Sequence, residues 1–128
     1  MTQPLYDLAG VVIGLAMKVH SEMGSGYLES VYKNALVIEL LEAGLKAEVE
    51  HRLTVFYRGS IVGDFIADIV INRMLIIELK AVSTLIKAHE VQLVNYLAAT
   101  GIEEGLLFNF GAERLEYKKK FRTCRFKS

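Results

Sequence analysis

The spacing of apolar residues changes near Gly44, and this change limits the chain to a fold that combines helices with a sheet. Apolar residues recur every three or four positions over Leu5–Met23 and Tyr27–Ala43, which predicts two helices. Gly24-Ser25-Gly26 separates them, because glycine costs about 1 kcal/mol in a helix interior. Over Ala47–Tyr57 the apolar residues alternate with polar ones, which predicts a strand with one buried face.

Two more strands are predicted directly after the first. They cover Ile61–Ile71 and Leu75–Ala81, and Asn72-Arg73 is the tight connection between them. A connection this short joins antiparallel strands, so the pair is expected to form a hairpin.

The last part of the chain predicts a crossover from one strand to another. A helix is expected over Leu85–Thr100, with Ser83 or Thr84 as its N-cap and Gly101 at its end. Gly105–Phe110 is an almost continuous apolar run, as expected for a buried parallel strand. A strand, a helix and a parallel strand in this order require a right-handed crossover.

A final strand or an extended tail is indicated by Leu115, Tyr117 and Phe121. The predicted order is therefore helix, helix, three strands, helix and two strands. This order is typical of an α/β or α+β fold. With 128 residues, the chain has the length of a single domain over residues 1–128.

Composition excludes several classes of protein. Lys+Arg and Asp+Glu both number 15, so a polycationic nucleic-acid binder is excluded, although a local basic site is not. The lone cysteine, Cys124, excludes an internal disulfide and a zinc site built from cysteines, and it fits a reducing compartment. The longest apolar run, Leu8–Met17, is too short to cross a bilayer, and no signal peptide is evident. We expect a cytoplasmic protein that does not associate with membranes.

Glu78 and Lys80 lie two residues apart in a predicted strand, so their side chains point to the same face. Asp68 lies on the neighbouring strand, opposite Ile77 or Glu78 depending on the geometry of the turn. Two converging carboxylates repel each other unless a cation lies between them, and Mg²⁺ or Mn²⁺ prefers oxygen ligands. The alternative is a surface ion pair between Glu78 and Lys80, which would contribute well under ~1 kcal/mol.

His89, Gln92 and Tyr96 share one stripe of the third predicted helix, and Gln92 and Tyr96 can point at one object. Alternatively, Tyr96 belongs to the core, Gln92 bonds its hydroxyl and His89 is exposed. Glu29 lies in the first turn of the second helix, which suits a carboxylate, and it could simply pair with Lys33.

Two further histidines differ in their expected roles. His20 precedes the glycine break and either faces the same cleft as Glu29 or is solvated. His51 takes an inward position in the alternating strand, so we expect it to be structural, at least partly buried and hydrogen-bonded.

The densest basic segment is near the C-terminus. It comprises Lys118, Lys119, Lys120, Arg122, Arg125 and Lys127. Such a segment can follow phosphates, with Phe121 and Phe126 available to stack on bases. A charged C-terminus that only increases solubility is the alternative.

Three motifs together resemble known families. Gly26-x-x-Glu29-x-x-Tyr32 resembles the signature of the GxxExxY protein family. Asp68 followed by Glu78-x-Lys80 resembles the core of the PD-(D/E)XK nuclease superfamily. Gln92-x-x-x-Tyr96 resembles the extra helical motif of its RecB-like branch. The resemblance extends from about Leu5 to Tyr117, and the combination in this order is specific although the Glu-x-Lys pair alone is weak.

The resemblance implies a restriction-endonuclease-like αβββαβ core, with a mixed sheet flanked by helices and an extra N-terminal helix. It also implies a Mg²⁺- or Mn²⁺-dependent nuclease, with DNA a more probable substrate than RNA. By this resemblance Asp68 and Glu78 are metal ligands, joined by the Leu79 carbonyl. Lys80 positions the attacking water, and Gln92 with Tyr96 orients the metal site or the phosphate.

The resemblance leaves two details open. Ala67 stands where the superfamily motif has proline, a departure that the superfamily tolerates. By the resemblance Glu29 binds the metal directly or through water. Some RecB-like members use a histidine from the first helical region as a metal ligand, a part that His20 could play, so the roles of Glu29 and His20 stay open.

Two other functions remain possible on the sequence alone. One is a non-catalytic module that keeps the fold and binds nucleic acid or protein. The other is an enzyme subunit that needs a homodimer or a larger complex to hold its substrate. The presence of every expected site residue favours the enzyme.

Overall fold

The computed structural model describes residues 7–122, so the expectations for Leu5, Cys124, Arg125, Phe126 and Lys127 lie outside the described residues. The helices are α1 (Leu8–Met23), α2 (Glu29–Glu42) and α3 (Lys87–Thr100), and the strands are β1 (Ala47–Tyr57), β2 (Ser60–Ile71), β3 (Leu75–Lys80), β4 (Glu104–Asn109) and β5 (Glu116–Phe121). This order confirms the predicted one.

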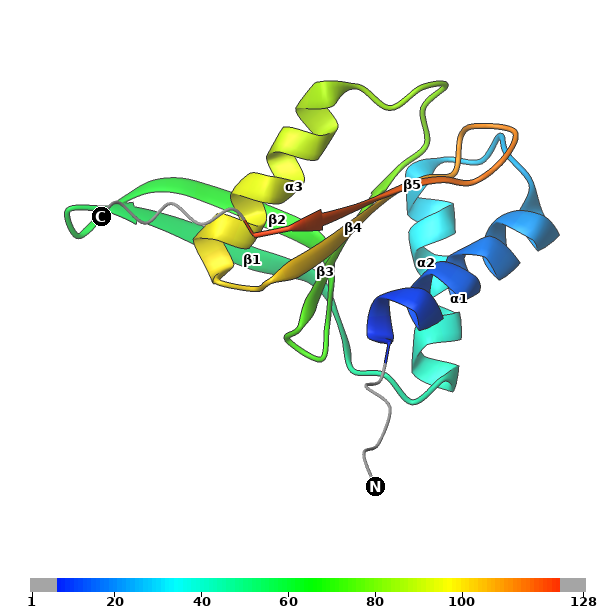
Figure 1. Cartoon of the computed structure of the whole chain (residues 1–128), viewed down its shortest axis with the longest axis horizontal. Coiled ribbons are helices and arrows are strands. Elements are labelled where there is room, and N and C mark those ends of the chain that lie inside the picture. The colour runs from blue at the N-terminus through cyan, green and yellow to red at the C-terminus, as the bar shows by residue number, and fades with distance from the viewer. Residues whose placement is uncertain (1–6, 123–128) are drawn as a thin grey trace.

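The described strands form one mixed sheet in the order β1-β2-β3-β4-β5 (Figure 1). β3 and β4 are parallel, with α3 as the crossover between them, and the other neighbouring strands are antiparallel. The predicted parallel strand and the predicted hairpin are both confirmed.

The helices cover opposite faces of the sheet (Figure 1). α1 and α2 pack on the face that carries Ile69, Ile77 and Phe108, which belong to the larger hydrophobic cluster. α3 packs on the other face, against a smaller cluster that includes Val70, Ile76 and Leu107. The sheet is therefore the middle layer, as the α/β prediction requires.

The β2–β3 turn follows its sequence signal. Asn72 and Arg73 both have positive φ, 52° and 54°, and the Met74 N–H donates to the Ile71 carbonyl at 2.9 Å. Two consecutive positive φ angles are typical of the hairpin turn that matches the twist of the strands.

Hydrogen bonds from the backbone to a side chain lie at the starts of α1 and α3. The Asp7 carboxylate accepts the Gly10 N–H at 2.9 Å, so α1 begins at Leu8. The prediction that Ser83 or Thr84 caps α3 is wrong. Instead, the Ile86 N–H donates to His89 Nδ1 at 3.2 Å, and the helix begins at Lys87.

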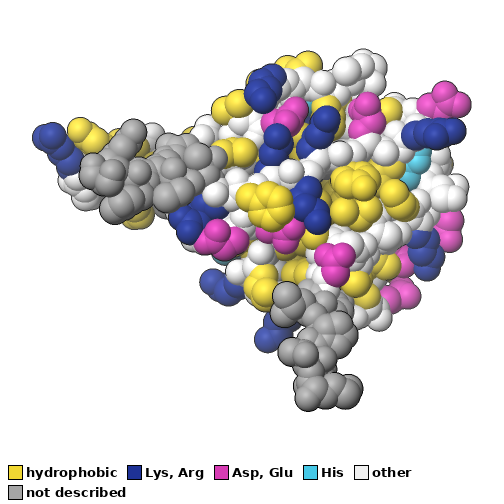
Figure 2. Space-filling view, in the orientation of Figure 1, with side chains coloured by type: hydrophobic (Ala, Val, Ile, Leu, Met, Phe, Trp, Pro, Cys, Tyr) yellow, Lys and Arg dark blue, Asp and Glu magenta, His cyan; other side chains and the backbone are white. Residues whose placement is uncertain are grey.

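The surface shows no separation of charge on the face seen in Figure 2, where basic and acidic side chains are interspersed. None of the helices in residues 7–122 combines the length and the apolar character needed to span a bilayer.

Candidate active site

The site forms where β2 and β3 separate. Their paired register ends at Ile69 and Ile77, and its continuation places Asp68 opposite Glu78. At this point hydrogen bonds from backbone N–H groups to side-chain carboxylates replace the backbone hydrogen bonds between β2 and β3. The Asp68 N–H donates to Glu78 Oε2 at 2.9 Å, and the Leu79 N–H donates to Asp68 Oδ2 at 2.8 Å. We call this point, with Asp68 and Glu78, the fork. The sequence left open whether Asp68 lies opposite Ile77 or Glu78, and the structure shows that it lies opposite Glu78.

The fork brings two carboxyl groups together in a poorly solvated place. Glu78 is 5% exposed, and Asp68 is half-buried. Burial, and then the negative charge of Asp68, raise the pKa of Glu78 to about 9. In the protein alone, Glu78 is therefore protonated at neutral pH, and a cation that binds there must displace this proton.

Two lysines bring positive charge to the fork. Lys80 is half-buried, and its charge opposes the upward shifts in the pKa of Glu78 and Glu29. Lys33 Nζ lies 3.1 Å from Glu50 Oε1 and 4.0 Å from Asp68 Oδ1.

Sequence reasoning did not place Lys33 and Glu50 at the site. Lys33 lies one helical turn after Glu29, a spacing that could have indicated it. Glu50 has a φ of 54°, in the region that non-glycine residues rarely adopt, at a position between the paired residues Val49 and His51. Nothing in the sequence marks this strained conformation.

Glu29 reaches the fork from the first residue of α2. Partial burial, and then the negative charge of Asp68, raise the pKa of its carboxyl group, and the positive charges of Lys80 and Lys33 oppose this shift. Glu29 therefore lies within electrostatic range of the fork, although no hydrogen bond joins it to Asp68 or Glu78 among the described residues.

The Gly26-x-x-Glu29-x-x-Tyr32 motif has a structural explanation. Tyr32 is fully buried and stacks on Phe110 at a centroid distance of 4.8 Å. Its hydroxyl donates to the Gly24 carbonyl and accepts the Tyr27 N–H. Gly26 has a φ of 118°, which favours glycine. These contacts hold the loop before α2 in place and so determine where Glu29 lies.

α3 contributes Gln92 and Tyr96. Tyr96 is 6% exposed, and burial followed by the charges of Glu78 and Asp68 raises the pKa of its phenol. Its hydroxyl has no hydrogen-bond partner within residues 7–122. The alternative in which Gln92 bonds this hydroxyl is therefore not observed, and both side chains line one groove. His89 instead accepts the Ile86 N–H.

The other two histidines lie outside the fork. His20 is buried, and its Nε2 lies 3.0 Å from the Ala112 carbonyl oxygen. Within the described chain it makes no contact with Asp68 or Glu78. His51 is half-buried with its Nδ1 2.8 Å from Glu48 Oε2, which confirms the prediction of a structural role.

The donor atoms at the fork are oxygens, which suit Mg²⁺ or Mn²⁺. In a strand, the N–H and the carbonyl of one residue point to the same side. The Leu79 N–H donates to Asp68, so the Leu79 carbonyl also faces the fork rather than β4. In residues 7–122, no three His, Cys, Asp or Glu side chains form a ready metal cage. Two carboxylates, one carbonyl and water nevertheless match the way Mg²⁺ is commonly held in proteins.

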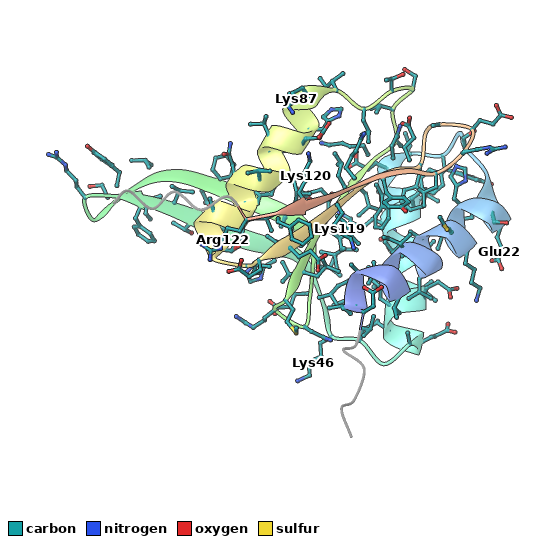
Figure 3. All side chains as sticks on the ribbon, in the orientation of Figure 1. Glu22, Lys46, Lys87, Lys119, Lys120 and Arg122 are labelled. Carbon is teal, nitrogen blue, oxygen red and sulfur yellow. The ribbon has the colours of Figure 1, made fainter. Side chains whose placement is uncertain are left out.

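The basic segment near the C-terminus is a strand in its described part (Figure 3). Lys120 pairs with Glu90 of α3 at 2.6 Å, and Lys119 lies 3.7 Å from Glu104. Arg122 pairs with Glu103. Lys119, Lys120 and Arg122 thus have acidic partners, and phosphate binding by the basic segment stays a prediction.

The chain was compared with protein families, curated proteins and solved structures. The family model for the PD-(D/E)XK nuclease superfamily matches residues 6–122. No curated protein matches the chain in sequence.

Solved structures give a further comparison. An alkaline exonuclease from Laribacter hongkongensis is similar with a TM-score of 0.53 and 12% identity, over 93% of this chain and 73% of that one. SSO0001 is similar with a TM-score of 0.49 and 19% identity, over 88% of this chain. The present chain spans 66% of the length of SSO0001. The likeness to the exonuclease shows a shared fold.

Proposed function

The chain belongs to the PD-(D/E)XK nuclease superfamily, and from this premise we propose that it is a metal-dependent nuclease that hydrolyses phosphodiester bonds in DNA. The observation that carries the proposal is the fork, where Asp68 and Glu78 converge beside Lys80. A fold by itself does not establish an activity, so the proposal depends on this arrangement of charges.

Asp68, Glu78 and the Leu79 carbonyl would hold one Mg²⁺ or Mn²⁺. When bound, such an ion polarises the phosphodiester and makes water a stronger nucleophile at neutral pH. The raised pKa of Glu78 supports this assignment, because a cation would stabilise the ionised form that burial, and then the negative charge of Asp68, disfavour.

The remaining residues act on the water and the phosphate. Lys80 would hold the attacking water and stabilise the negative charge that develops on the phosphate. Glu29 would bind the ion through water, since it faces the fork without touching either carboxylate. Gln92 and Tyr96 would orient the phosphate from α3.

The finer assignment within the superfamily is also a proposal. The Gly26, Glu29 and Tyr32 pattern supports membership of the GxxExxY family, and Gln92 with Tyr96 supports the RecB-like branch. His20 is the weaker candidate for the additional metal ligand, because its ring is bound to the Ala112 carbonyl. A cytoplasmic location, and assembly into a homodimer or a larger complex, belong to the same proposal.

The test is a cleavage assay on linear, circular and single-stranded DNA with Mg²⁺ or Mn²⁺. We expect cleavage by the parent and a loss of about 10²–10⁴-fold in Lys80→Ala. Lys46→Ala is the matched control, because Lys46 is exposed and lies beside the β2–β3 turn (Figure 3). A parent that cleaves no DNA form with either metal would contradict the proposal and favour a non-catalytic binding module.

A further inference from the structure

A groove of about 420 Å³ lies between α3 and the β1–β2 hairpin. Its size falls within the range of small-molecule sites in proteins. The groove is lined by Val55, Phe65, Gln92, Asn95, Tyr96, Ala98 and Ala99. Of these described residues, none carries a charge, so the groove is suited to a flat uncharged group rather than to a phosphate.

Two aromatic rings meet in the groove, Phe65 from β2 and Tyr96 from α3. The rings of Phe65 and Tyr96 have a centroid distance of 5.8 Å and an interplanar angle of 47°. Phe65 is 44% exposed, and a Cβ at Gly63 would lie 2.8 Å from its ring. Glycine at this position thus provides the space in which the Phe65 ring lies.

Gln92 is one of the polar residues that line the groove. Gln92 is exposed, and its amide has no hydrogen-bond partner within the described residues. A side-chain amide offers one acceptor and two donors, which is the pattern that recognises the edge of a nucleobase.

Tyr96 links the groove to the surroundings of the fork. Tyr96 lines the groove, and it is close enough to Glu78 and Asp68 for their charges to act on its phenol. Phe65 precedes Asp68 by three residues on β2, which corresponds to roughly 10 Å along a strand. A nucleic-acid strand with a phosphate at the fork therefore has a base within reach of the groove.

We propose that the groove binds one unpaired nucleobase of the strand whose phosphate lies at the fork. The base would stack on Phe65 and Tyr96, with its edge facing the Gln92 amide. This inference rests on the proposed nuclease function and adds to it a substrate class, namely single strands and frayed ends. Paired DNA must first be opened to supply the base, and this opening makes it a poorer substrate.

A second copy of the chain is the competing occupant. The hairpin carries exposed apolar side chains, including Phe56, Tyr57 and Ile61, which could pack against another protein. The concave shape, the unpartnered Gln92 amide and the position of Tyr96 near Glu78 and Asp68 favour the base, and the oligomeric state of a groove-filling variant distinguishes the two occupants.

The test combines a groove-filling variant with abasic substrates. Ala99→Leu fills the groove and preserves helix propensity, and Ala88→Leu is the matched control on an exposed part of α3 outside it. After the cut site is mapped, single-stranded oligonucleotides with one abasic residue at each nearby position are compared. We expect one position to lower kcat/KM about tenfold to a hundredfold in the parent and in Ala88→Leu.

In Ala99→Leu, kcat/KM for the intact substrate should fall by about the same factor. The abasic residue should then lower kcat/KM no further. Equilibrium binding to Lys80→Ala, measured by the fluorescence of 2-aminopurine at the same position, should show the same pattern without depending on cleavage. Cleavage by the parent with no abasic effect, and with Ala99→Leu equal to Ala88→Leu, would overturn the groove proposal and leave the nuclease proposal intact.

Two further results would also overturn the groove proposal. One is a change of mass in sedimentation for Ala99→Leu alone, which would identify a second copy as the occupant. The other is binding of 2-aminopurine oligonucleotides that neither the abasic residue nor Ala99→Leu affects. Loss of cleavage in the parent, with the expected binding pattern retained, would contradict only the nuclease function.

Discussion

The two faces of the sheet use tyrosine for different purposes. Under α2, Tyr32 is fully buried, and its hydroxyl bonds to the backbone of residues 24 and 27. Under α3, Tyr96 is also largely buried, but its hydroxyl has no hydrogen-bond partner in the described part of the chain. The first face satisfies its polar groups internally, whereas the second keeps polar groups available for a ligand.

The same contrast holds for charge. On the α1 and α2 face, buried His20 bonds to a carbonyl. At the fork, by contrast, Asp68 and Glu78 are held close together, and burial, followed by the negative charge of Asp68, raises the pKa of Glu78. Internal polar bonding stabilises a fold, while strongly perturbed pKa values are typical of functional sites. Substitutions on the α2 face should therefore act mainly on stability, and substitutions at the fork should act mainly on metal binding and cleavage.

The largest effect is expected at the fork. Asp68→Asn should lower cleavage about a thousandfold, because a ligand that contributes several kcal/mol to charge stabilisation is lost. It should also abolish the Mn²⁺-dependent rise in Tm. Without metal, Asp68→Asn should be at least as stable as the parent, since the negative charge that disfavours ionisation of Glu78 has been removed.

Asp64→Asn provides the control for this comparison. Asp64 lies on the same strand and pairs with Arg52 in an exposed position. It should keep both cleavage and the metal-dependent shift in Tm. A metal-free Asp68→Asn that is less stable than the parent, together with an unchanged shift with Mn²⁺, would make Asp68 a scaffold residue.

The pH dependence of stability tests Glu78. Its pKa is about 9 in the folded chain against 4.5 ordinarily, so between these values the folded chain holds a proton that the unfolded chain has lost. The contribution of Glu78 to stability is therefore complete below about pH 4.5 and declines as the pH rises toward 9. Denaturant titrations should show this decline in the parent and a flatter profile in Glu78→Gln, and equal slopes in the two proteins would refute the assignment.

A smaller effect is expected on the face of the sheet under α2. Tyr32→Phe should lower the free energy of unfolding by about 1–3 kcal/mol, because the Gly24 carbonyl and the Tyr27 N–H lose their partner. Thermal unfolding should show this as a lower Tm. Cleavage should also fall, since Glu29 is placed by this loop, but Mn²⁺ should still raise the Tm.

The matched substitution on the face of the sheet under α3 is Tyr96→Phe. It should change the free energy of unfolding by less than ~0.5 kcal/mol, because the hydroxyl leaves no partner unsatisfied. Cleavage should fall about tenfold if the hydroxyl orients the phosphate, without a change in Tm. A loss of stability equal to that of Tyr32→Phe would remove the distinction between the two faces.

The smallest effect is expected on β5. Lys119→Ala removes one partner of a partly exposed ion pair with Glu104, which contributes about 0–1 kcal/mol. DNA affinity measured over a range of salt concentrations should keep its slope. A decrease in the slope by about 1 would show that Lys119 contacts a phosphate and would restore the basic segment to the binding surface.

Much of the fold could be predicted from the sequence, because its signals lie within a few residues of one another. The change from helical to alternating spacing determined the order of the elements. Asn72-Arg73 determined the hairpin turn, and Gly101, with a φ of 77°, determined the end of α3. Glu29, Asp68, Glu78, Lys80, Gln92 and Tyr96 could be identified as candidates from their types and spacing.

Only the tertiary structure decided how these residues meet. The alignment of Asp68 with Glu78 depends on where two strands separate, and the position of Lys33 beside Glu50 and Asp68 depends on how α2 packs on the sheet. The bond from His20 to Ala112 and the groove beside Tyr96 join segments far apart in the chain. Periodicity records which face of an element is buried, but the partner of each side chain is set by long-range packing, which no local pattern contains.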